Sequence, residues 1–443
     1  MSATTKTVLF DQSNVAYRMG TGIATYARNL AGAARAAGWG VQALLSADSK
    51  VDPKDPVLSE VTLFDAKREG AWEWPSAVMD AVRGVARAPF GYRPVRLAAS
   101  GAVLRPSGSS PAFDEVHVVA RAFEAARARF YVTGRFSTVR MAAAPALFHA
   151  TFPLPIRVSG CPNIVTIHDL VPLRLPYMTL DNKRYFYKLV KKLLTEADHI
   201  VTVSEFSKRD IVALFGIDEK RITNTYQSVS LPASAVDAPD GAVAELLRNL
   251  YELEHGDFYL FLGALEPKKN VARLIDAYAA SGSKRPLVIA GGQGWNNKAE
   301  LATIKSPRFA QYRLNENVIS RFERVRRVEY VPLNQLVMLM RGARAVLFPS
   351  VFEGFGLPVL EAMTLGTAVM TSDVTSMPEI AADAALLVDP YDVTGMAAAI
   401  RRLDGDDALV RELGRRGRAR AEAFSPAAYV ERVREVYSRV GLG

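Results

Sequence analysis

Two carboxylates, Glu353 and Glu361, lie eight residues apart with a Gly-Phe-Gly turn at 354–356 between them. Carboxylates accept hydrogen bonds from hydroxyl groups, and glycine lets the backbone approach a ligand closely. Backbone N–H groups at the start of a helix bind anions such as a diphosphate. Acceptor carboxylates beside such a helix start suit a sugar nucleotide, because its diphosphate has sugar hydroxyls on one side and ribose hydroxyls on the other.

The residues around the two carboxylates predict a strand, a glycine loop and a short helix. Ala345–Phe348 is an apolar, strand-like run. Pro358 suits the first turn of a helix because its φ is fixed and its missing N–H would be unpaired there anyway. Gly366 is a natural end for that helix. We therefore expect Glu353 in the loop and Glu361 in the first turn of the helix, within reach of one ligand.

Glycines and lysines follow two other strand-like runs. Gly20-Thr21-Gly22 comes after the run Thr7–Asp11 and opens a predicted helix, so it suits either a phosphate or a purely steric turn. Lys268 and Lys269 follow the run Phe258–Leu262. A lysine at such a strand end can neutralise a diphosphate leaving group, and a solvated lysine pair is the alternative.

A histidine and an aspartate, His168 and Asp169, stand at the end of the strand-like run Asn163–His168. His168 can exchange one hydrogen bond with a reacting sugar, or it can be held by Asp169 or the backbone in a structural role. Ser204 precedes a predicted helix as its N-cap.

Strand-like and helix-like segments alternate in two blocks, which predicts two Rossmann-like domains with parallel sheets. We expect an N-terminal domain at 1–235, a C-terminal domain at 236–424 and a terminal helix at 425–443. Residues 230–241 are irregular and suit an interdomain linker. Residues 65–140 are less periodic and are interpreted as a basic insertion with some helix. The strand-like runs of the second block are 258–262, 287–290, 328–331, 345–348, 368–371 and 385–388.

The composition is that of a globular protein, with 443 residues, 49% apolar and 23% charged. The single cysteine, Cys161, excludes an internal disulfide framework and suits a reducing cytoplasm. The five histidines show no metal-ligand spacing. We find no signal peptide and no run of about 18 apolar residues, so a cytoplasmic location is expected.

The formal net charge is +9, and residues 66–140 hold 12 Lys and Arg against 6 Asp and Glu. Aromatic residues are interleaved with the arginines there. The mixture suits either a peripheral contact with anionic lipid on the inner face of the cytoplasmic membrane or a solvated basic face. No nucleic-acid motif accompanies the charge, so no nucleic-acid partner is expected. The residues concerned are Trp72, Trp74, Phe90, Tyr92, Arg83, Arg87, Arg93 and Arg96.

The segment Pro349–Met363 resembles the Glu-x7-Glu signature of retaining glycosyltransferases of family 4, which have the GT-B fold. The likeness continues through Gly366-Thr367 and Met377-Pro378-Glu379 to Val388-Asp389-Pro390. It implies an α/β protein with two Rossmann-like domains facing across a cleft. The predicted terminal helix, Pro426–Val440, resembles the helix that crosses back to the N-terminal domain in that fold.

The resemblance also implies roles for the candidate residues. His168, Glu353 and Lys269 would be catalytic, with Glu353 on the hydroxyls of the donor sugar, and Glu361 would hold the ribose. The donor-binding residues would be Gly20, Thr21, Gly22, Lys268, Lys269, Glu353, Gly354, Phe355, Gly356, Leu357 and Glu361. Relatives carry an arginine near Ala264 and an Asn-Gly-Val turn at Tyr226–Val229, and this chain departs from both patterns. The match is poorest in the N-terminal half, so acceptor-binding residues stay unassigned.

Several motifs are similar to those of bacterial mannosyltransferases of polysaccharide or O-antigen synthesis. We therefore expect a hexose, mannose from GDP-mannose first, to be transferred with retention to a lipid-linked or growing glycan. UDP-glucose and dTDP-rhamnose stay open as donors. An epimerase, a phosphorylase and a non-catalytic scaffold of a polysaccharide assembly complex are the rival functions. No Asp-x-Asp motif stands at a strand end, so we expect no obligatory metal and no cofactor besides the nucleotide sugar.

Overall fold

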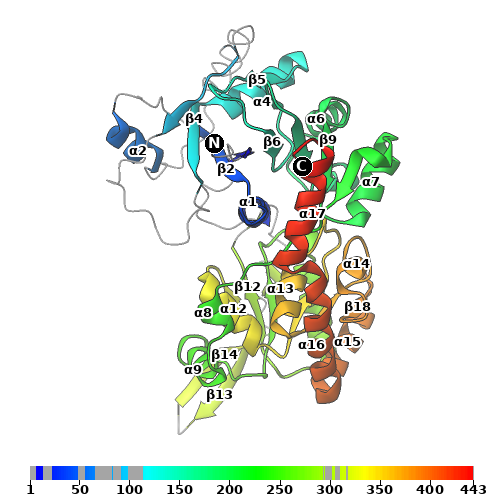
Figure 1. The fold of residues 1–443 in the computed structure, drawn as a ribbon. Coiled ribbons are helices and arrows are strands. Elements are labelled where there is room, and N and C mark those ends of the chain that lie inside the picture. The colour runs from blue at the N-terminus through cyan, green and yellow to red at the C-terminus, as the bar shows by residue number, and fades with distance from the viewer. Residues whose placement is uncertain are drawn as a thin grey trace.

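The computed structural model describes residues 6–12, 22–47, 55–64, 82, 91–97, 113–292, 294, 302–304, 310–315 and 318–442. These residues form two α/β lobes, each built on a mainly parallel sheet with helices around it (Figure 1). The first lobe holds the blue to green part of the chain and the second the green to orange part. The predicted fold class is confirmed.

The first sheet has eight described strands, parallel to their neighbours except at β3, which pairs antiparallel with β4. Their core positions are apolar on both faces, as expected where helices cover both sides of a parallel sheet. In spatial order the strands are β10 (Ile222–Asn224), β9 (His199–Thr202), β8 (Asn163–Thr166), β6 (Leu147–Ala150), β1 (Thr7–Asp11), β2 (Gly40–Ala47), β4 (Glu115–Ala120) and β3 (Val95–Leu97).

The second sheet has six described strands, all parallel. In spatial order they are β15 (Val325–Val328), β12 (Leu287–Ala290), β11 (Tyr259–Leu262), β16 (Ala345–Phe348), β17 (Ala368–Ser372) and β18 (Leu386–Val388). Counted along the second lobe this is the order 3-2-1-4-5-6, which reverses between β11 and β16. Ligands of such sheets bind at the carboxyl ends of the strands at that reversal.

Two small sheets complete the strands: β5 (Ser137–Val139) pairs with β7 (Ile156–Val158), and β13 (Ala310–Asn315) pairs with β14 (Val318–Glu323). The helices of the first lobe are α1 (Gly22–Ala36), α2 (Pro56–Phe64), α4 (Ala122–Thr133), α5 (Val171–Arg174), α6 (Lys183–Glu196), α7 (Glu205–Phe215) and η1 (Glu219–Arg221). Those that follow are α8 (Ala233–Val236), α9 (Asp240–Tyr251), η2 (Pro267–Lys269), α10 (Val271–Ser281), α12 (Leu333–Gly342), α13 (Leu357–Leu365), α14 (Met377–Ala381), α15 (Val393–Gly405), α16 (Asp407–Ala421), η4 (Glu422–Phe424) and α17 (Pro426–Arg439).

The terminal helix α17 crosses from the second lobe to the first, as predicted. Figure 1 shows it in red, running upward beside α1, and the two helices are in contact. The hydroxyl of Tyr437 on α17 lies 2.8 Å from Nδ1 of His149 on β6. A second buried bond joins Nε2 of His149 to the hydroxyl of Thr166 at 2.8 Å. The crossing helix is therefore anchored in the core of the first lobe.

Three sequence predictions about the fold are corrected. Residues 115–133 of the predicted basic insertion form β4 and α4, and β4 pairs with β2 in the main sheet. The predicted irregular linker contains α8 and the start of α9, and both helices pack on α12. The strand predicted at 328–331 is β15, which lies earlier, at Val325–Val328, and Pro332 is the N-cap of α12.

The basic, aromatic surface predicted within 66–140 is only partly described by the structure. Trp72, Trp74, Arg83, Arg87 and Phe90 lie outside the described residues. Tyr92 is buried and packs in the core of the first lobe, so its ring cannot face a membrane. Arg96 forms an ion pair with Glu115 at 3.0 Å. Tyr92 is therefore excluded from a membrane surface, whereas Arg93 and Arg96 are exposed, and a membrane contact of this segment stays a prediction.

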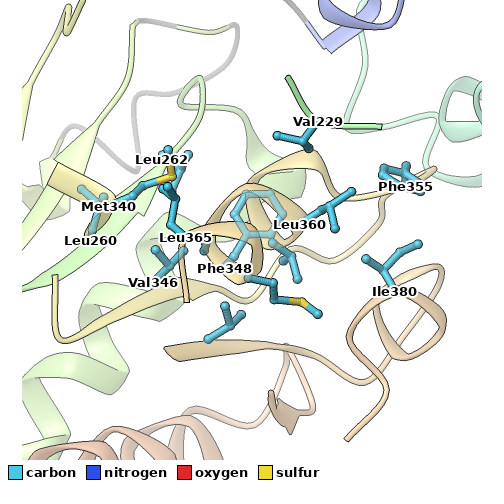
Figure 2. Packing of buried hydrophobic residues seen from close by; sticks show 14 of the residues in the cluster. Val229, Leu260, Leu262, Met340, Val346, Phe348, Phe355, Leu360, Leu365 and Ile380 are labelled. Carbon is cyan, nitrogen blue, oxygen red and sulfur yellow. The ribbon is translucent and has the colours of Figure 1, made fainter. Parts of the chain in front are cut away.

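Apolar residues beneath the Glu353 loop hold it in place. Figure 2 shows Phe348 at the end of β16 among Val346, Leu360 and neighbouring side chains, with Phe355 and Ile380 at the edge of the cluster. Phe348 and Leu360 are fully buried, and Phe355 is nearly so. Each such side chain contributes roughly 2 kcal/mol by leaving water. The loop therefore starts and ends on a rigid apolar base.

Candidate active site

The Glu353 loop is shaped by hydroxyl groups from neighbouring loops. The hydroxyl of Ser350 lies 2.7 Å from Oε1 of Glu353, and the hydroxyl of Ser376 lies 3.0 Å from the carbonyl oxygens of Glu353 and Phe355. The N–H of Glu353 donates to the hydroxyl of Thr375 at 3.3 Å. Glu353 itself is 8% exposed. Its carboxylate is therefore fixed in one position at the end of β16.

A lysine from the neighbouring strand end meets that carboxylate. Lys269, in η2 after β11, lies 2.6 Å from Oε1 of Glu353, and both side chains are nearly buried. Its ammonium also stands 4.9 Å from the centre of the Phe348 ring, a cation–π contact. Asn270 donates to the carbonyl of Pro349 at 3.0 Å and so ties the lysine segment to the loop. The pair thus lies at the reversal of strand order between β11 and β16.

The charges of this cluster stabilise one another. Burial by itself raises the pKa of Glu353, but the charges of Lys269 and Lys268 outweigh it and hold that pKa below its usual value. Burial lowers the pKa of Lys268, and the carboxylates of Glu353 and Asp169 more than offset this and raise it. Lys268 and Glu353 are therefore charged at neutral pH. Two cations and one carboxylate can hold a diphosphate and a polar sugar side by side.

Glu361 differs from Glu353 in its surroundings. It stands in the second turn of α13, since the helix begins at Leu357, and not in the first turn as predicted. Pro358 and the left-handed Gly366 mark the two helix ends as expected. Burial raises the pKa of Glu361 to about 7. This carboxyl therefore exchanges a proton in the neutral range, unlike Glu353.

His168 is held in one tautomer from the first lobe. Its Nε2 lies 2.8 Å from the carbonyl oxygen of Thr151, which can only accept, so Nε2 carries the proton. The edge of the Tyr26 ring packs on the imidazole at 4.7 Å between centroids. Burial lowers the pKa of His168, against the opposing effects of Thr151 and Asp169. The neutral ring keeps Nδ1 as an acceptor for a sugar hydroxyl.

The two lobes meet at these residues. The hydroxyl of Ser207 on α7 lies 2.9 Å from the carbonyl oxygen of His168 and 3.3 Å from that of Gly354. A Cβ at Gly22, the first residue of α1, would stand 3.8 Å from Leu357, the first residue of α13. The starts of two helices, one from each lobe, therefore lie side by side next to the cation cluster. Both helix starts favour negative charge.

The remaining predicted donor residues have different outcomes. Gly20 and Thr21 lie outside the described residues. The side chain of Phe355 is buried and packs edge-on against Phe424, so only its backbone can face a ligand. A Cβ at Gly356 would stand 2.2 Å from Cε of Met377, and its φ of 103° also requires glycine. At the departure from the family pattern, Tyr226 has a φ of 58° and packs on Phe424 at 5.2 Å.

Several residues that hold His168 and the start of α7 in place were not predicted from the sequence. Asp11 accepts hydrogen bonds from the N–H and hydroxyl of Thr151, whose carbonyl holds His168. The carboxylate of Glu379 accepts from the N–H groups of Glu205 and Phe206, at 2.7 and 3.0 Å, and so caps α7 from the other lobe. Ser204 caps the same helix, as predicted. The Met-Pro-Glu motif was the one signal that pointed to Glu379.

Gly354 offers a direct test of the contact between the lobes. A Cβ there would stand 2.5 Å from the carbonyl oxygen of His168, and both atoms belong to rigid backbone. We expect Gly354→Ala to separate the lobes locally and to lower turnover by about tenfold or more, as small displacements of reacting groups do. Gly241→Ala, at a position with open space around it, is the matched control. Equal turnover of the two variants would mean that this contact is not part of the active geometry.

The part of the chain that the structure describes contains no group of three or more His, Cys, Asp or Glu side chains arranged to hold a metal ion. Within the same residues, no helix combines the length and apolar character needed to cross a membrane.

Two family models together cover most of the chain. The model described as "Glycosyl transferase 4-like domain" matches residues 21–225, and that described as "Glycosyl transferases group 1" matches residues 245–420. The O-antigen chain mannosyltransferase B of Escherichia coli is 33% identical over 287 residues, which are 63% of this chain and 70% of that protein. RfbU, an O-antigen chain mannosyltransferase of Salmonella typhimurium, is 27% identical over 54% of this chain and 60% of its own length. A serotype-specific mannosyltransferase WbdA of Escherichia coli is 28% identical over 59% of this chain, but the match spans 32% of that longer protein.

Solved structures share the arrangement of the two lobes. Anabaena Alr3699/HepE, in complex with UDP and glucose, superposes with a TM-score of 0.63 at 14% identity and covers 98% of this chain and 100% of that one. Sucrose-phosphate synthase of Thermosynechococcus elongatus superposes with a TM-score of 0.60 at 18% identity, covering 98% of each chain. The two Rossmann-like lobes therefore have the GT-B fold, and the family models and relatives identify the chain as a glycosyltransferase. The chain belongs to the group 1 family of GT-B glycosyltransferases. Within that family it resembles bacterial O-antigen mannosyltransferases.

Proposed function

We propose that the protein is a retaining mannosyltransferase, which moves mannose from GDP-mannose to a lipid-linked or growing bacterial glycan. The observation that carries the proposal is the buried contact of Lys269 with Glu353 beside His168, where the two lobes meet. The names of two of the relatives, both O-antigen chain mannosyltransferases, support mannose as the sugar. The same names refer to O-antigen chains and so support a growing glycan as the acceptor.

In the proposed mechanism, the bond between C1 of mannose and the diphosphate breaks as charge develops on the diphosphate. Lys269, Lys268 and the two facing helix starts stabilise that charge. Glu353 and Nδ1 of His168 accept hydrogen bonds from mannose hydroxyls and orient the ring. A new C1–O bond forms to the acceptor hydroxyl on the same face, and the hydroxyl proton passes to the departing diphosphate oxygen. Retention follows because donor and acceptor share that face.

We propose that no metal is required, because lysines and helix starts supply the positive charge that a metal would otherwise provide. Activity should then persist in EDTA. A loss of activity in EDTA that manganese restores would contradict this part of the proposal.

The transfer itself is tested with GDP-mannose and a synthetic polyprenyl-diphosphate acceptor that ends in mannose. We expect a disaccharide product with an α linkage in its NMR spectrum, which signifies retention from an α-linked donor. UDP-glucose and dTDP-rhamnose serve as competing donors. A β linkage would contradict retention. Product formation with UDP-glucose or dTDP-rhamnose but not with GDP-mannose would contradict the choice of mannose.

The pKa of Glu361 predicts a pH dependence of donor binding. If Glu361 accepts hydrogen bonds from both ribose hydroxyls, its ionised form should bind the donor more strongly than its protonated form, because a carboxylate is the stronger acceptor. Because its pKa is about 7, the ionised fraction falls about tenfold from pH 8 to pH 6. The dissociation constant of GDP-mannose, measured by calorimetry, should rise by about the same factor, and Glu361→Gln should remove the dependence. If the affinity of the unmodified protein for GDP-mannose were constant over this pH range, Glu361 would have no part in donor binding.

A further inference from the structure

Two large apolar side chains are exposed at the rim of the candidate active site. Tyr177 is 69% exposed and Leu180 is 78% exposed. They lie in the segment that joins α5 to α6, and α5 begins two residues after Asp169. The charge of Asp181, in the same segment, contributes to the raised pKa of Lys268. The segment therefore lies within electrostatic range of Lys268 and exposes two large apolar side chains to water.

The next helix, α6, has one apolar face and one cationic face. Leu189, Val190, Leu193 and Leu194 are buried against the lobe. Arg184, Lys188 and Lys191 recur at helical spacing on the opposite, exposed side. Of the cations on α6, Lys192 forms an ion pair with Glu196 at 2.8 Å. Within the described residues, Lys188 and Lys191 form no ion pair, so their charges face solvent.

Aromatic rings extend this surface to the neighbouring helices. Tyr187 of α6 is exposed and stacks on Phe215 at the end of α7, with 5.3 Å between ring centroids. The ammonium of Lys191 stands 6.0 Å from the centre of the Tyr187 ring. Leu214 of α7 is also exposed. Figure 1 shows α6 and α7 adjacent on the outer side of the first lobe. Cations and partly exposed rings thus alternate from the rim segment to the end of α7.

We infer that this surface, formed by residues 177–191 and the end of α7, docks on an anionic phospholipid bilayer. Exposed aromatic and leucine side chains enter the boundary between headgroups and acyl chains, and the lysines and arginine meet the headgroup phosphates. The inference rests on the proposed function in one respect: a lipid-linked acceptor would then reach the site from the same side as the bilayer. The charge pattern selects the occupant, since α6 presents cations outward and the opposing surface must be negative.

Vesicle sedimentation of the full chain tests the inference. The vesicles contain phosphatidylcholine with about one lipid in three replaced by phosphatidylglycerol, and pure phosphatidylcholine vesicles are the comparison. We expect the protein to bind the anionic vesicles, and Lys188→Glu/Lys191→Glu to lower its partition coefficient by about tenfold or more. Leu180→Ser should lower it about fivefold. Arg402→Glu/Arg411→Glu, on exposed cations of α15 and α16, changes the net charge equally and should bind as the unmodified protein does.

The outcomes separate this inference from the proposed function. GDP-mannose binding by calorimetry in the absence of lipid should be the same in all these variants, because none of the substituted residues touches the donor cluster. Retained donor binding with lost vesicle binding supports the docking surface. Failure of the unmodified protein to bind anionic vesicles, or equal binding by Lys188→Glu/Lys191→Glu and the control, overturns it. Absence of donor binding in every variant would instead count against the proposed function.

Discussion

Glu353→Gln should lower turnover by about 100-fold while the protein stays folded. Glutamine has the shape of glutamate, so the contacts of the loop with Ser350 and Thr375 can persist. The substitution replaces a charged acceptor by an amide, which weakens the hydrogen bonds from the sugar hydroxyls. It also leaves Lys269 with an uncompensated charge in a nearly buried position. Transfer from GDP-mannose under saturating donor measures the effect.

Glu431→Gln is the matched control for this variant. Glu431 is exposed and pairs with Arg434 at 2.6 Å within the terminal helix α17. Its loss should leave turnover unchanged, since exposed ion pairs contribute little. If Glu353→Gln kept the turnover of the control, the assignment of Glu353 to the donor sugar would be wrong. Thermal unfolding of both variants establishes that any loss of activity is not a loss of fold.

Lys269→Met should have the second large effect, a fall in turnover of about 100-fold or more. Methionine fills a similar volume but cannot stabilise the charge that develops on the departing diphosphate. Lys268 remains nearby and retains part of the positive charge, so donor binding should weaken less than turnover. Steady-state measurement of kcat and KM separates the two contributions.

Two further variants interpret the result at Lys269. Lys269→Arg keeps the charge and should recover part of the turnover, whereas Lys284→Met, at an exposed lysine in the same lobe, should change nothing. Combining Lys269→Met with Glu353→Gln should cost less than the sum of the two, because the residues act as a contacting pair. Strictly additive losses would mean that the ion pair has no part in the mechanism.

The sequence predicts the site elements well wherever the signal is local. The run from Ala345 to Gly366 forms strand, loop and helix as expected, because proline, glycine and apolar residues act through neighbouring backbone angles. The block around Lys269 is placed correctly at the end of β11 for the same reason. Glu361 lies just beyond the predicted first turn, because it is the fifth residue of a helix that begins at Leu357.

Prediction fails where distant residues decide the structure. The strand β4 carries the polar residues Glu115 and His117, so its place beside β2 depends on pairing that no local pattern reveals. The helices α8 and α9 begin after proline residues, and their packing on α12 stabilises a segment that reads as irregular. Tyr92 is aromatic and stands next to arginine in sequence, but only the folded chain shows that its ring is buried.

The same limit applies to the residues that position the site. Asp11, Thr151 and Ser207 are far apart in the sequence of the first lobe. Thr151 and Ser207 contact His168, and Asp11 acts on it through Thr151. Glu379 caps α7 from the second lobe, a contact between residues more than 170 positions apart. Hydrogen bonds of this kind follow from the tertiary fold, so a single sequence cannot specify them.

A thermal-shift panel of GDP, UDP, dTDP and their sugar conjugates, without metal, tests the central claim most directly. A ligand that binds only the native state raises the melting temperature by mass action. At a ligand concentration of a hundred times the dissociation constant, the free energy of unfolding rises by roughly 3 kcal/mol. We predict shifts with GDP and GDP-mannose that are strongly reduced in Lys269→Met and unchanged in Lys284→Met. Shifts confined to uridine or thymidine nucleotides would contradict the choice of donor. No shift with any nucleotide would contradict the assignment of a nucleotide-sugar site to Lys269, Glu353 and Glu361.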